Sequence, residues 1–192
     1  MRVTGGVLSG RRLVAPKGPP VRPTADHVRQ ALFNLLGPRV EGASVLDLFC
    51  GSGALGIEAI SRGASHVTFV DRSIFSIRAV ESNLKSLGLD TRRPLLPYTL
   101  LRCDSPAAVK KLAKQSSSFD LVFLDPPYGL DLARKSLNAL CRCAIVARTG
   151  LIAAEHARRE ELPSSMEGEG GLFVLRHSSS YGETKLSIYE RQ

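Results

Sequence analysis

The sequence of 192 residues has no run of 18 apolar residues and therefore contains no candidate for a membrane-spanning helix. Its opening residues, Met1 to Gly6, lack the apolar stretch of a secretory signal, which predicts a cytoplasmic protein. Cysteine is scarce, and the four cysteines form no C-x-x-C pair, so we expect reduced, mostly buried thiols rather than disulfides or metal ligands. The four histidines are scattered, and we predict no metal site.

The length of the chain is sufficient for one domain with a hydrophobic core, and a hydrophobic content of 43% is ordinary for a globular protein. We therefore predict a single domain over 1–192. Within it, we expect a basic arm and a helix over 1–42 and an α/β core over 43–192.

Apolar runs alternate with helical segments through most of the core. The pattern predicts strands near 44–49, 66–70, 98–103, 119–124 and 150–155, and helices near 53–62, 73–87, 105–115 and 131–147. Such alternation is typical of βαβ units, which place helices on both faces of a parallel sheet. Two later runs, Leu172 to His177 and Thr184 to Glu190, predict an antiparallel pair at the sheet edge, and the Glu/Gly stretch 167–171 predicts a loop. The fold class is therefore α/β, with seven strands that are mostly parallel.

The N-terminal segment is expected to form a small hairpin or an extended arm around Gly5, Gly6 and Gly10. A helix should follow from Thr24 or Ala25 to Leu36, because Thr24 can cap it and Gly37-Pro38 stops it. Its apolar stripe should pack on the core and leave Arg29 available for solvent or RNA.

A glycine-rich loop follows the first strand of the core, in the run Asp47-Leu-Phe-Cys-Gly-Ser-Gly-Ala-Leu-Gly56. Its glycines permit positive φ and close approach of a ligand, and the helix that starts near Gly53 presents free N–H groups. The spacing of Gly51, Gly53 and Gly56 also matches the dinucleotide pattern G-x-G-x-x-G, with Asp71 at the distance of a ribose-binding acid.

A cationic cofactor fits this loop better than a nicotinamide dinucleotide, because Asp47 would face a pyrophosphate unfavourably. S-adenosylmethionine carries a sulfonium, an ammonium and a ribose, and no phosphate. Asp47 near its methionine end, Asp71 on the ribose hydroxyls and Asp104 near the adenine amino group form a coherent set. Asp104 has a second interpretation, since it precedes Ser105-Pro106 and could simply cap the next helix.

The tetrapeptide Asp125-Pro126-Pro127-Tyr128 follows the apolar run Phe119 to Leu124, where a buried strand ends. The prolines hold Asp125 and the neighbouring carbonyl in a stiff arrangement. The carboxylate and the Pro126 carbonyl can accept both N–H bonds of an amino group on an aromatic ring, with Tyr128 beneath the base. Taken alone, the same residues could be a strand-ending turn.

Positive charge is concentrated at the start of the chain. The net charge is +8, and residues 1–42 carry +5 of it. A basic arm rich in glycine and proline predicts a polyanionic partner, because clustered Lys and Arg displace phosphate counterions. The alternative is a generic solvated surface with a basic bias.

These motifs resemble the Rossmann-like S-adenosylmethionine-dependent methyltransferases that act on exocyclic amino groups, and within them the RsmD-type 16S rRNA guanine-966 N2-methyltransferases. The resemblance is carried by Met1 to Gly6 with Gly10-Arg11-Arg12-Leu13, by Arg22-Pro23-Thr24 leading into Val28 to Asn34, and by the two motifs above. It covers nearly the whole chain. The chain departs from the family pattern at three places. Ser73 stands where similar proteins often have a second acid, and the segments Thr91 to Pro97 and Pro163 to Gly171 match poorly.

The resemblance implies methyl transfer from S-adenosylmethionine to guanine N2 of 16S rRNA, in a small subunit or an assembly intermediate, by a monomeric enzyme. It implies three groups of site residues: for catalysis Asp125, Pro126, Pro127 and Tyr128; for the cofactor Asp47, Phe49, Gly51, Gly53, Asp71, Arg72 and Asp104; and for RNA Arg2, Arg11, Arg12, Arg22, Thr24 and Arg29. Two alternatives remain open, an adenine-N6 DNA methyltransferase and a non-catalytic RNA-binding module. The first lacks obvious room for a target-recognition domain, and the second leaves Asp125 to Tyr128 unexplained.

Overall fold

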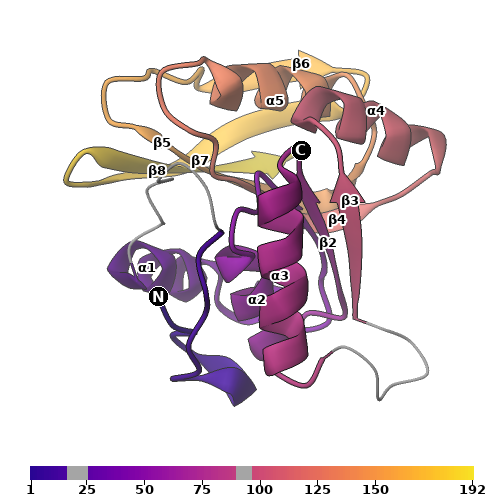
Figure 1. The fold of residues 1–192 in the computed structure, drawn as a ribbon. Coiled ribbons are helices and arrows are strands. Elements are labelled where there is room, and N and C mark those ends of the chain that lie inside the picture. The colour runs from indigo at the N-terminus through magenta and orange to yellow at the C-terminus, as the bar shows by residue number, and fades with distance from the viewer. Residues whose placement is uncertain (17–25, 90–96) are drawn as a thin grey trace.

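In a computed structural model that describes residues 1–16, 26–89 and 97–192, one twisted sheet lies between two layers of helices (Figure 1). Helices α1, α2 and α3 cover one face, and α4 and α5 cover the other. The helices are α1 Asp26–Leu36, α2 Ala54–Ser61, α3 Ile74–Ser86, α4 Ser105–Lys114 and α5 Leu132–Cys141, with short 3-10 turns η1 Gly6–Leu8 and η2 Gly37–Val40. The strands are β1 Ser44–Leu48, β2 His66–Asp71, β3 Tyr98–Arg102, β4 Phe119–Leu124, β5 Val146–Ala157, β6 Ser165–Gly168, β7 Gly171–Tyr181 and β8 Thr184–Arg191.

The strand order is β3-β2-β1-β4-β5-β8-β7-β6. Strands β1 to β5 pair in parallel, and β8, β7 and β6 continue the sheet in antiparallel fashion. Chain order reverses between β1 and β4, since β2 and β3 extend one way and β5 the other. In open α/β sheets, ligands bind outside the carboxyl ends of the strands at such a reversal.

The core has two parts, one on each face of the sheet. On one face, Leu32 and Phe33 of α1 and Val80 of α3 pack with Val45 and Phe123. On the other face, Val109, Leu112, Leu137 and Leu140 of the last two helices pack with strand residues such as Leu46 and Val122. Residues one apart on a strand face opposite sides, so both faces of the central strands need apolar side chains. This requirement explains their nearly continuous apolar sequences.

The predicted fold class is confirmed: the sheet is parallel at its centre and antiparallel at its C-terminal edge, with helices on both faces. The structure adds an eighth strand, β6, where the sequence predicted a loop around 167–171. The short strand extends the β7 hairpin and buries Met166 against the core. A Cβ at Gly168 would lie 2.4 Å from the Cys141 carbonyl oxygen, so glycine allows the hairpin turn to pack on the end of α5.

The predicted helix over 131–147 is shorter in the structure and ends at Cys141. The carbonyl of Cys141 accepts the N–H of Gly170 at 2.7 Å, and the Phe119 N–H donates to Ile145 at 2.8 Å. Strand β5 then begins at Val146, which pairs with Phe119. Apolar, β-branched residues at 145 and 146 are buried in the sheet rather than on a helix face, which helical periodicity alone does not reveal.

The N-terminal arm forms the expected small hairpin. Arg2 and Arg12 make an antiparallel bridge, and the Val3 N–H donates to the Arg11 carbonyl at 2.9 Å. The arm also packs on the core, because Val3 and Leu13 are buried. The arm is drawn in indigo beside α2 and α3 (Figure 1). The expected helix start at Thr24 or Ala25 and the segment Thr91 to Pro97 fall largely or wholly outside the described residues.

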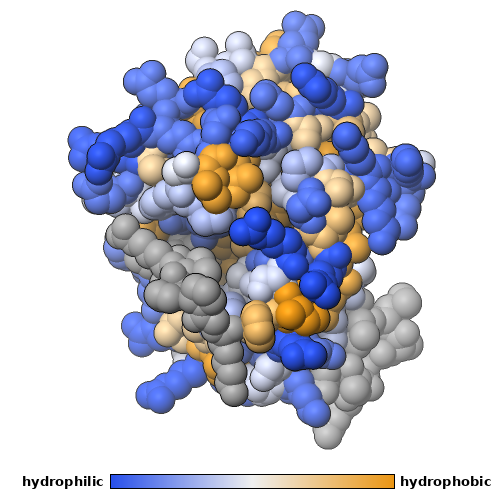
Figure 2. Space-filling view, turned by 45° about the horizontal axis from the view of Figure 1, so that its top comes forward, coloured by the Kyte–Doolittle hydropathy of each residue, from blue (hydrophilic) through white to orange (hydrophobic). Residues whose placement is uncertain are grey.

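Large exposed apolar side chains are scattered among hydrophilic ones, and Figure 2 shows them on one face as separate orange patches.

The four cysteines are free; Cys50 and Cys141 are buried, and Cys103 and Cys143 are partly buried. In the described part of the chain, no helix has the length and apolar character needed to span a membrane. Nor do residues 1–16, 26–89 and 97–192 contain a cluster of His, Cys, Asp or Glu that could hold a metal ion.

Candidate active site

Acidic residues stand at the carboxyl ends of four neighbouring strands. Asp71 ends β2, Asp47 is the fourth residue of β1, Asp125 follows β4, and Glu155 lies near the end of β5. Asp47 pairs with Phe123, and Leu124 pairs with Ala154, so the continuing register brings Asp125 beside Glu155. Because side chains alternate along a strand, the acids of β1, β2 and β5 point to the face that α1, α2 and α3 cover.

The glycine-rich loop joins β1 to α2 with the positive φ that the sequence predicts at Gly51 and Gly53, and with a positive φ at Phe49 that it does not predict. Phe49, Gly51 and Gly53 all have positive φ, at 70°, 54° and 80°. A Cβ at Gly56 would lie 2.2 Å from a ring carbon of Phe69, so the third glycine allows α2 to pack closely on β2. The loop thus lies at the strand-order reversal, with Gly51 half-buried and Gly53 buried.

Asp47 is buried to 1% exposure, and its two oxygens differ. Its Oδ2 accepts the Gly56 N–H at 3.0 Å, whereas Oδ1 is buried with no hydrogen-bond donor among the described residues. Burial raises the pKa of Asp47 from 3.8 to about 7; the Gly56 N–H opposes this rise, and the charges of Asp125 and Asp71 add to it. A buried carboxylate with an unmet acceptor is stabilised by a cation.

The remaining predicted cofactor residues lie at the carboxyl ends of β2 and β3. Asp71 is engaged by backbone: Oδ2 accepts the Gly51 N–H at 3.0 Å and Oδ1 accepts the Ser73 N–H at 2.8 Å. Arg72 is exposed beside it. Asp104 is exposed and caps α4 by accepting the Ala107 N–H at 3.1 Å, as the capping interpretation expected. Its role toward adenine stays a prediction.

The Asp125 to Tyr128 segment leaves β4 directly beside the glycine loop. Asp125 and Tyr128 are partly buried, Pro126 is buried and Pro127 is exposed. The Tyr128 hydroxyl lies 2.7 Å from Oγ1 of Thr184, the first residue of β8. The segment therefore places a carboxylate, a proline carbonyl and an aromatic ring on one short loop at the ligand-binding edge.

Three of the predicted RNA-binding arginines, Arg2, Arg11 and Arg12, are exposed on the arm. The Arg11 guanidinium donates to the Ser86 carbonyl at 2.8 Å, which ties the arm to the end of α3. Arg22 and Thr24 lie outside the described residues. Arg2 lies 3.8 Å from Asp26 of α1, so the three exposed arginines are spread along the arm between α1 and the end of α3.

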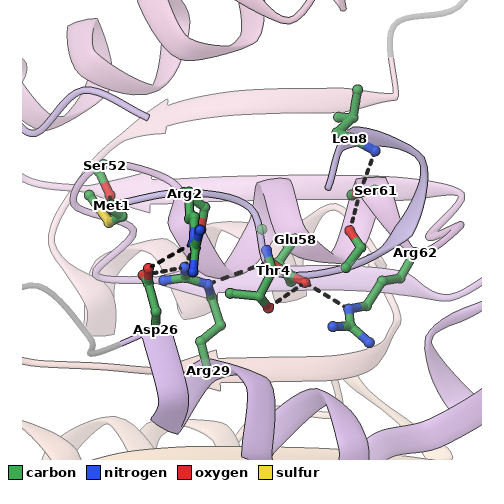
Figure 3. Close-up of polar contacts among 12 residues, drawn as sticks. Met1, Arg2, Thr4, Leu8, Asp26, Arg29, Ser52, Glu58, Ser61 and Arg62 are labelled. Carbon is green, nitrogen blue, oxygen red and sulfur yellow. Dashed lines mark hydrogen bonds and ion pairs between the residues drawn. The ribbon is translucent and has the colours of Figure 1, made fainter. Parts of the chain in front are cut away.

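The prediction that Arg29 is available for RNA is wrong, because its side chain is fully buried. Its guanidinium lies 2.8 Å from Asp26 and 3.5 Å from Glu58, and it donates to the Arg2 carbonyl. Figure 3 shows this network between the arm and α2. Arg29 holds the arm in place instead of contacting a ligand.

Glu58 is the centre of that network and was missed in the sequence. Its carboxylate accepts the Thr4 N–H at 2.7 Å and the Thr4 hydroxyl at 2.9 Å, and it pairs with Arg62 at 2.8 Å (Figure 3). A signal was present, since Glu58 stands between Ile57 and Ala59 on a mostly apolar helix. A charged residue there must find buried partners.

Asn83 of α3 connects the arm to the glycine loop. It is fully buried, and its side chain binds both the N–H and the carbonyl of Val14 and the carbonyl of Ser52. The Ser52 hydroxyl also lies 3.5 Å from Sδ of Met1 (Figure 3). The basic arm and the loop that follows β1 therefore share direct contacts.

Comparison with known proteins gives a family match over residues 1–190, to the family described as "Conserved hypothetical protein 95". Among curated relatives, "Putative rRNA methyltransferase YlbH" of Bacillus subtilis (strain 168) is 40% identical, with full coverage of both chains. "Ribosomal RNA small subunit methyltransferase D" of Escherichia coli (strain K12) is 31% identical over all of this chain and 90% of that protein.

Solved structures agree with the sequence relatives. "Putative methyltransferase yhhF from Escherichia coli" superposes with a TM-score of 0.80 at 30% identity, over 100% of this chain and 98% of that one. A more distant structure, the SMU.776 methyltransferase complexed with SAH, has a TM-score of 0.59 at 19% identity over 85% of this chain and 48% of that one, and it shows the shared fold alone.

Proposed function

Because the chain belongs to the conserved hypothetical protein 95 family, we propose that it transfers a methyl group from S-adenosylmethionine to the exocyclic N2 of a guanine in 16S rRNA. Relatives named as rRNA methyltransferases, one of them a small-subunit enzyme, support the reaction and the class of substrate. The observation that carries the proposal is the Asp125 to Tyr128 segment beside the Asp47 loop, at the reversal of strand order. Guanine 966 as the target follows from the resemblance.

The residues around the β1 loop fit a cationic cofactor. Asp47 has a buried oxygen with no donor among the described residues, and a cation can meet that need without help from solvent. Phe49, Gly51 and Gly53 form the turn from β1 into α2 with positive φ, while Asp71, Arg72 and Asp104 stand along the same edge of the sheet. When bound there, S-adenosylmethionine supplies an electrophilic methyl group on its sulfonium sulfur.

Asp125, Pro126 and Tyr128 would bind the acceptor. An exocyclic amino group shares its lone pair with the ring and is a weak nucleophile. Accepting both of its N–H bonds, at the Asp125 carboxylate and the Pro126 carbonyl, favours a nitrogen that is rehybridised toward the tetrahedral form and leaves the lone pair free. The Tyr128 ring stacks on the base and sets its plane. Most of the acceleration comes from alignment, and Asp125 or a water takes the proton after transfer.

The arm would hold RNA, and it reaches the β1 loop through the contacts of Met1 and Val14 with Ser52 and Asn83. Arg2, Arg11 and Arg12 are exposed and can contact phosphates, which position a nucleic acid without reading its sequence. The target amino group lies within stacked or paired RNA, so the base must be exposed or flipped to reach Tyr128. We propose Arg22 and Thr24 for the same surface on the resemblance alone. A monomer acting in the cytoplasm on a small subunit or an assembly intermediate completes the proposal.

Substrate choice tests this function. The full chain is given labelled S-adenosylmethionine with small ribosomal subunits, with duplex DNA, or with neither, and compared with Asp125→Ala. We expect label in the small-subunit RNA only, lost in Asp125→Ala, whose cofactor affinity stays close to wild type. Asp120→Ala is the matched control, because Asp120 lies at the opposite end of β4 and accepts the Ser44 N–H. Label in DNA, or full activity of Asp125→Ala, would overturn the assignment.

A further inference from the structure

We propose that Thr184 is a positioning residue for methyl transfer, whose hydroxyl fixes the Tyr128 ring in the orientation that receives the base. The inference rests on the proposed function and deepens it, because it adds the β7–β8 hairpin to the acceptor pocket. Its basis is the 2.7 Å contact between the Tyr128 hydroxyl and Thr184 Oγ1, which joins positions 56 residues apart.

The side chain of Tyr128 needs a contact that fixes its orientation, because it lies on a largely exposed loop. It lies on the segment between β4 and α5, in which Pro127, Gly129 and Leu130 are exposed. Gly129 and Asp131 both have positive φ, so the segment turns sharply after the ring. A tyrosine on such a loop can rotate about its side-chain bonds unless its far end is held. The hydroxyl is the polar end of the ring, and its bond to Thr184 limits that rotation.

Thr184 is well suited to be the fixed partner. It is 5% exposed and begins β8, where it pairs with Ala157 of β5 on one side and with Tyr181 of β7 on the other. Its branched Cβ restricts the side chain to few rotamers, so Oγ1 is held in place relative to the sheet. The strands, rather than the loop that carries Tyr128, therefore fix the position of its ring.

The hydroxyl of Thr184 is separable from the packing of its side chain. Valine has nearly the same shape and can fill the same buried space, but it leaves the Tyr128 hydroxyl without this partner. Serine keeps the hydroxyl and loses only a methyl group. The two replacements therefore distinguish orientation of the ring from stability of the hairpin.

The kinetic test compares Thr184→Val, Thr184→Ser, Tyr128→Phe and the double variant, with small subunits as substrate. Losing one hydrogen bond of ordinary strength corresponds to a fall in kcat of about three- to tenfold. We expect that fall in Thr184→Val and in Tyr128→Phe, no further fall in the double variant, and near wild-type kcat in Thr184→Ser. The Kd for S-adenosylhomocysteine should stay unchanged, and the loss of one hydrogen bond should lower the Tm by no more than about 2–4 °C. Thr99→Val is the control, because Thr99 bonds to His66 at the opposite edge of the sheet.

A second readout is independent of activity. The chain has four tyrosines, so incorporation of 3-fluorotyrosine gives a small set of fluorine NMR signals, and Tyr128→Phe identifies the one from Tyr128. We expect that signal to shift or broaden in Thr184→Val and to keep its wild-type position in Thr184→Ser. A wild-type kcat in Thr184→Val, or an unaltered Tyr128 signal, overturns the inference. A wild type that methylates no RNA, with a Tyr128 signal that still responds to Thr184→Val, overturns the proposed function and supports the anchor.

Discussion

Cofactor affinity should depend on the ionisation of Asp47, and the direction of the dependence follows from the structure. Burial raises the pKa of Asp47 to about 7, so the carboxyl of the free protein gains its proton as the pH falls through that value. A cationic ligand binds the carboxylate form and must displace that proton. Affinity for S-adenosylmethionine should therefore be greatest above pH 7 and should weaken progressively below it.

The expected size can be worked out from the pKa. If only the carboxylate form binds, the apparent Kd rises by about tenfold at pH 6 and about a hundredfold at pH 5, relative to its limit at high pH. The α-ammonium of the ligand stays largely protonated over pH 5 to 7, because α-amino groups titrate near 7.7 to 8.0. The change in affinity between pH 5 and 7 therefore reports the ionisation of the protein and not that of the ligand.

Isothermal titration calorimetry between pH 5 and 7 measures this dependence, with Asp47→Asn as the matched variant. The variant should bind weakly, with an affinity that no longer follows the pH. In the free protein, the raised pKa means that the ionised, buried carboxylate destabilises the fold, by about 4 kcal/mol once the pH exceeds 7. Asp47→Asn should therefore unfold at higher denaturant concentration than wild type at pH 8. A flat wild-type affinity from pH 5 to 7 would refute the reasoning.

Two further predictions concern the arm. Glu58→Gln removes the charge that faces Arg29 and Arg62 and should lower the free energy of unfolding by about 3–5 kcal/mol, as when one partner of a buried ion pair is lost. Denaturant titration measures this loss. A loss no larger than that caused by the exposed control change Glu81→Gln would contradict the prediction. Arg12→Gln should weaken RNA binding and reduce the magnitude of the slope of log K against log salt by about 0.7–0.9 for one lost phosphate contact. Arg142→Gln, on the opposite helical layer, should leave that slope unchanged, and an equal effect of both changes would place the RNA elsewhere.

The parts of the site that the sequence predicted are those that local chain chemistry determines. The Asp47 loop combines a buried strand, glycines at fixed spacing and a helix start within ten residues, and the positive φ values of Gly51 and Gly53 follow directly, whereas that of Phe49 was not expected. Asp125 to Tyr128 could be placed because an apolar strand precedes it. The alternation of apolar and helical segments is also a local pattern, and it predicted the class of the fold and most of the strands.

The missed features depend on contacts between distant segments. Arg29 lies on the buried face of α1 with Leu32 and Phe33, and two of the partners that its guanidinium needs there, Glu58 and the Arg2 carbonyl, come from distant segments. Thr184 lies 56 residues after Tyr128, and no local pattern links the two. Strand β6 is too short and too rich in Glu and Gly to signal a strand; its pairing with β7 and the burial of Met166 create it.

The central claim is the identity of the methylated group. Small ribosomal subunits that lack guanine-N2 modifications are incubated with the full chain and labelled S-adenosylmethionine, and the RNA is then digested to nucleosides. The account predicts label in N2-methylguanosine, absent when Asp125→Ala replaces the wild type. Label in another nucleoside, or none despite tight cofactor binding, would contradict it.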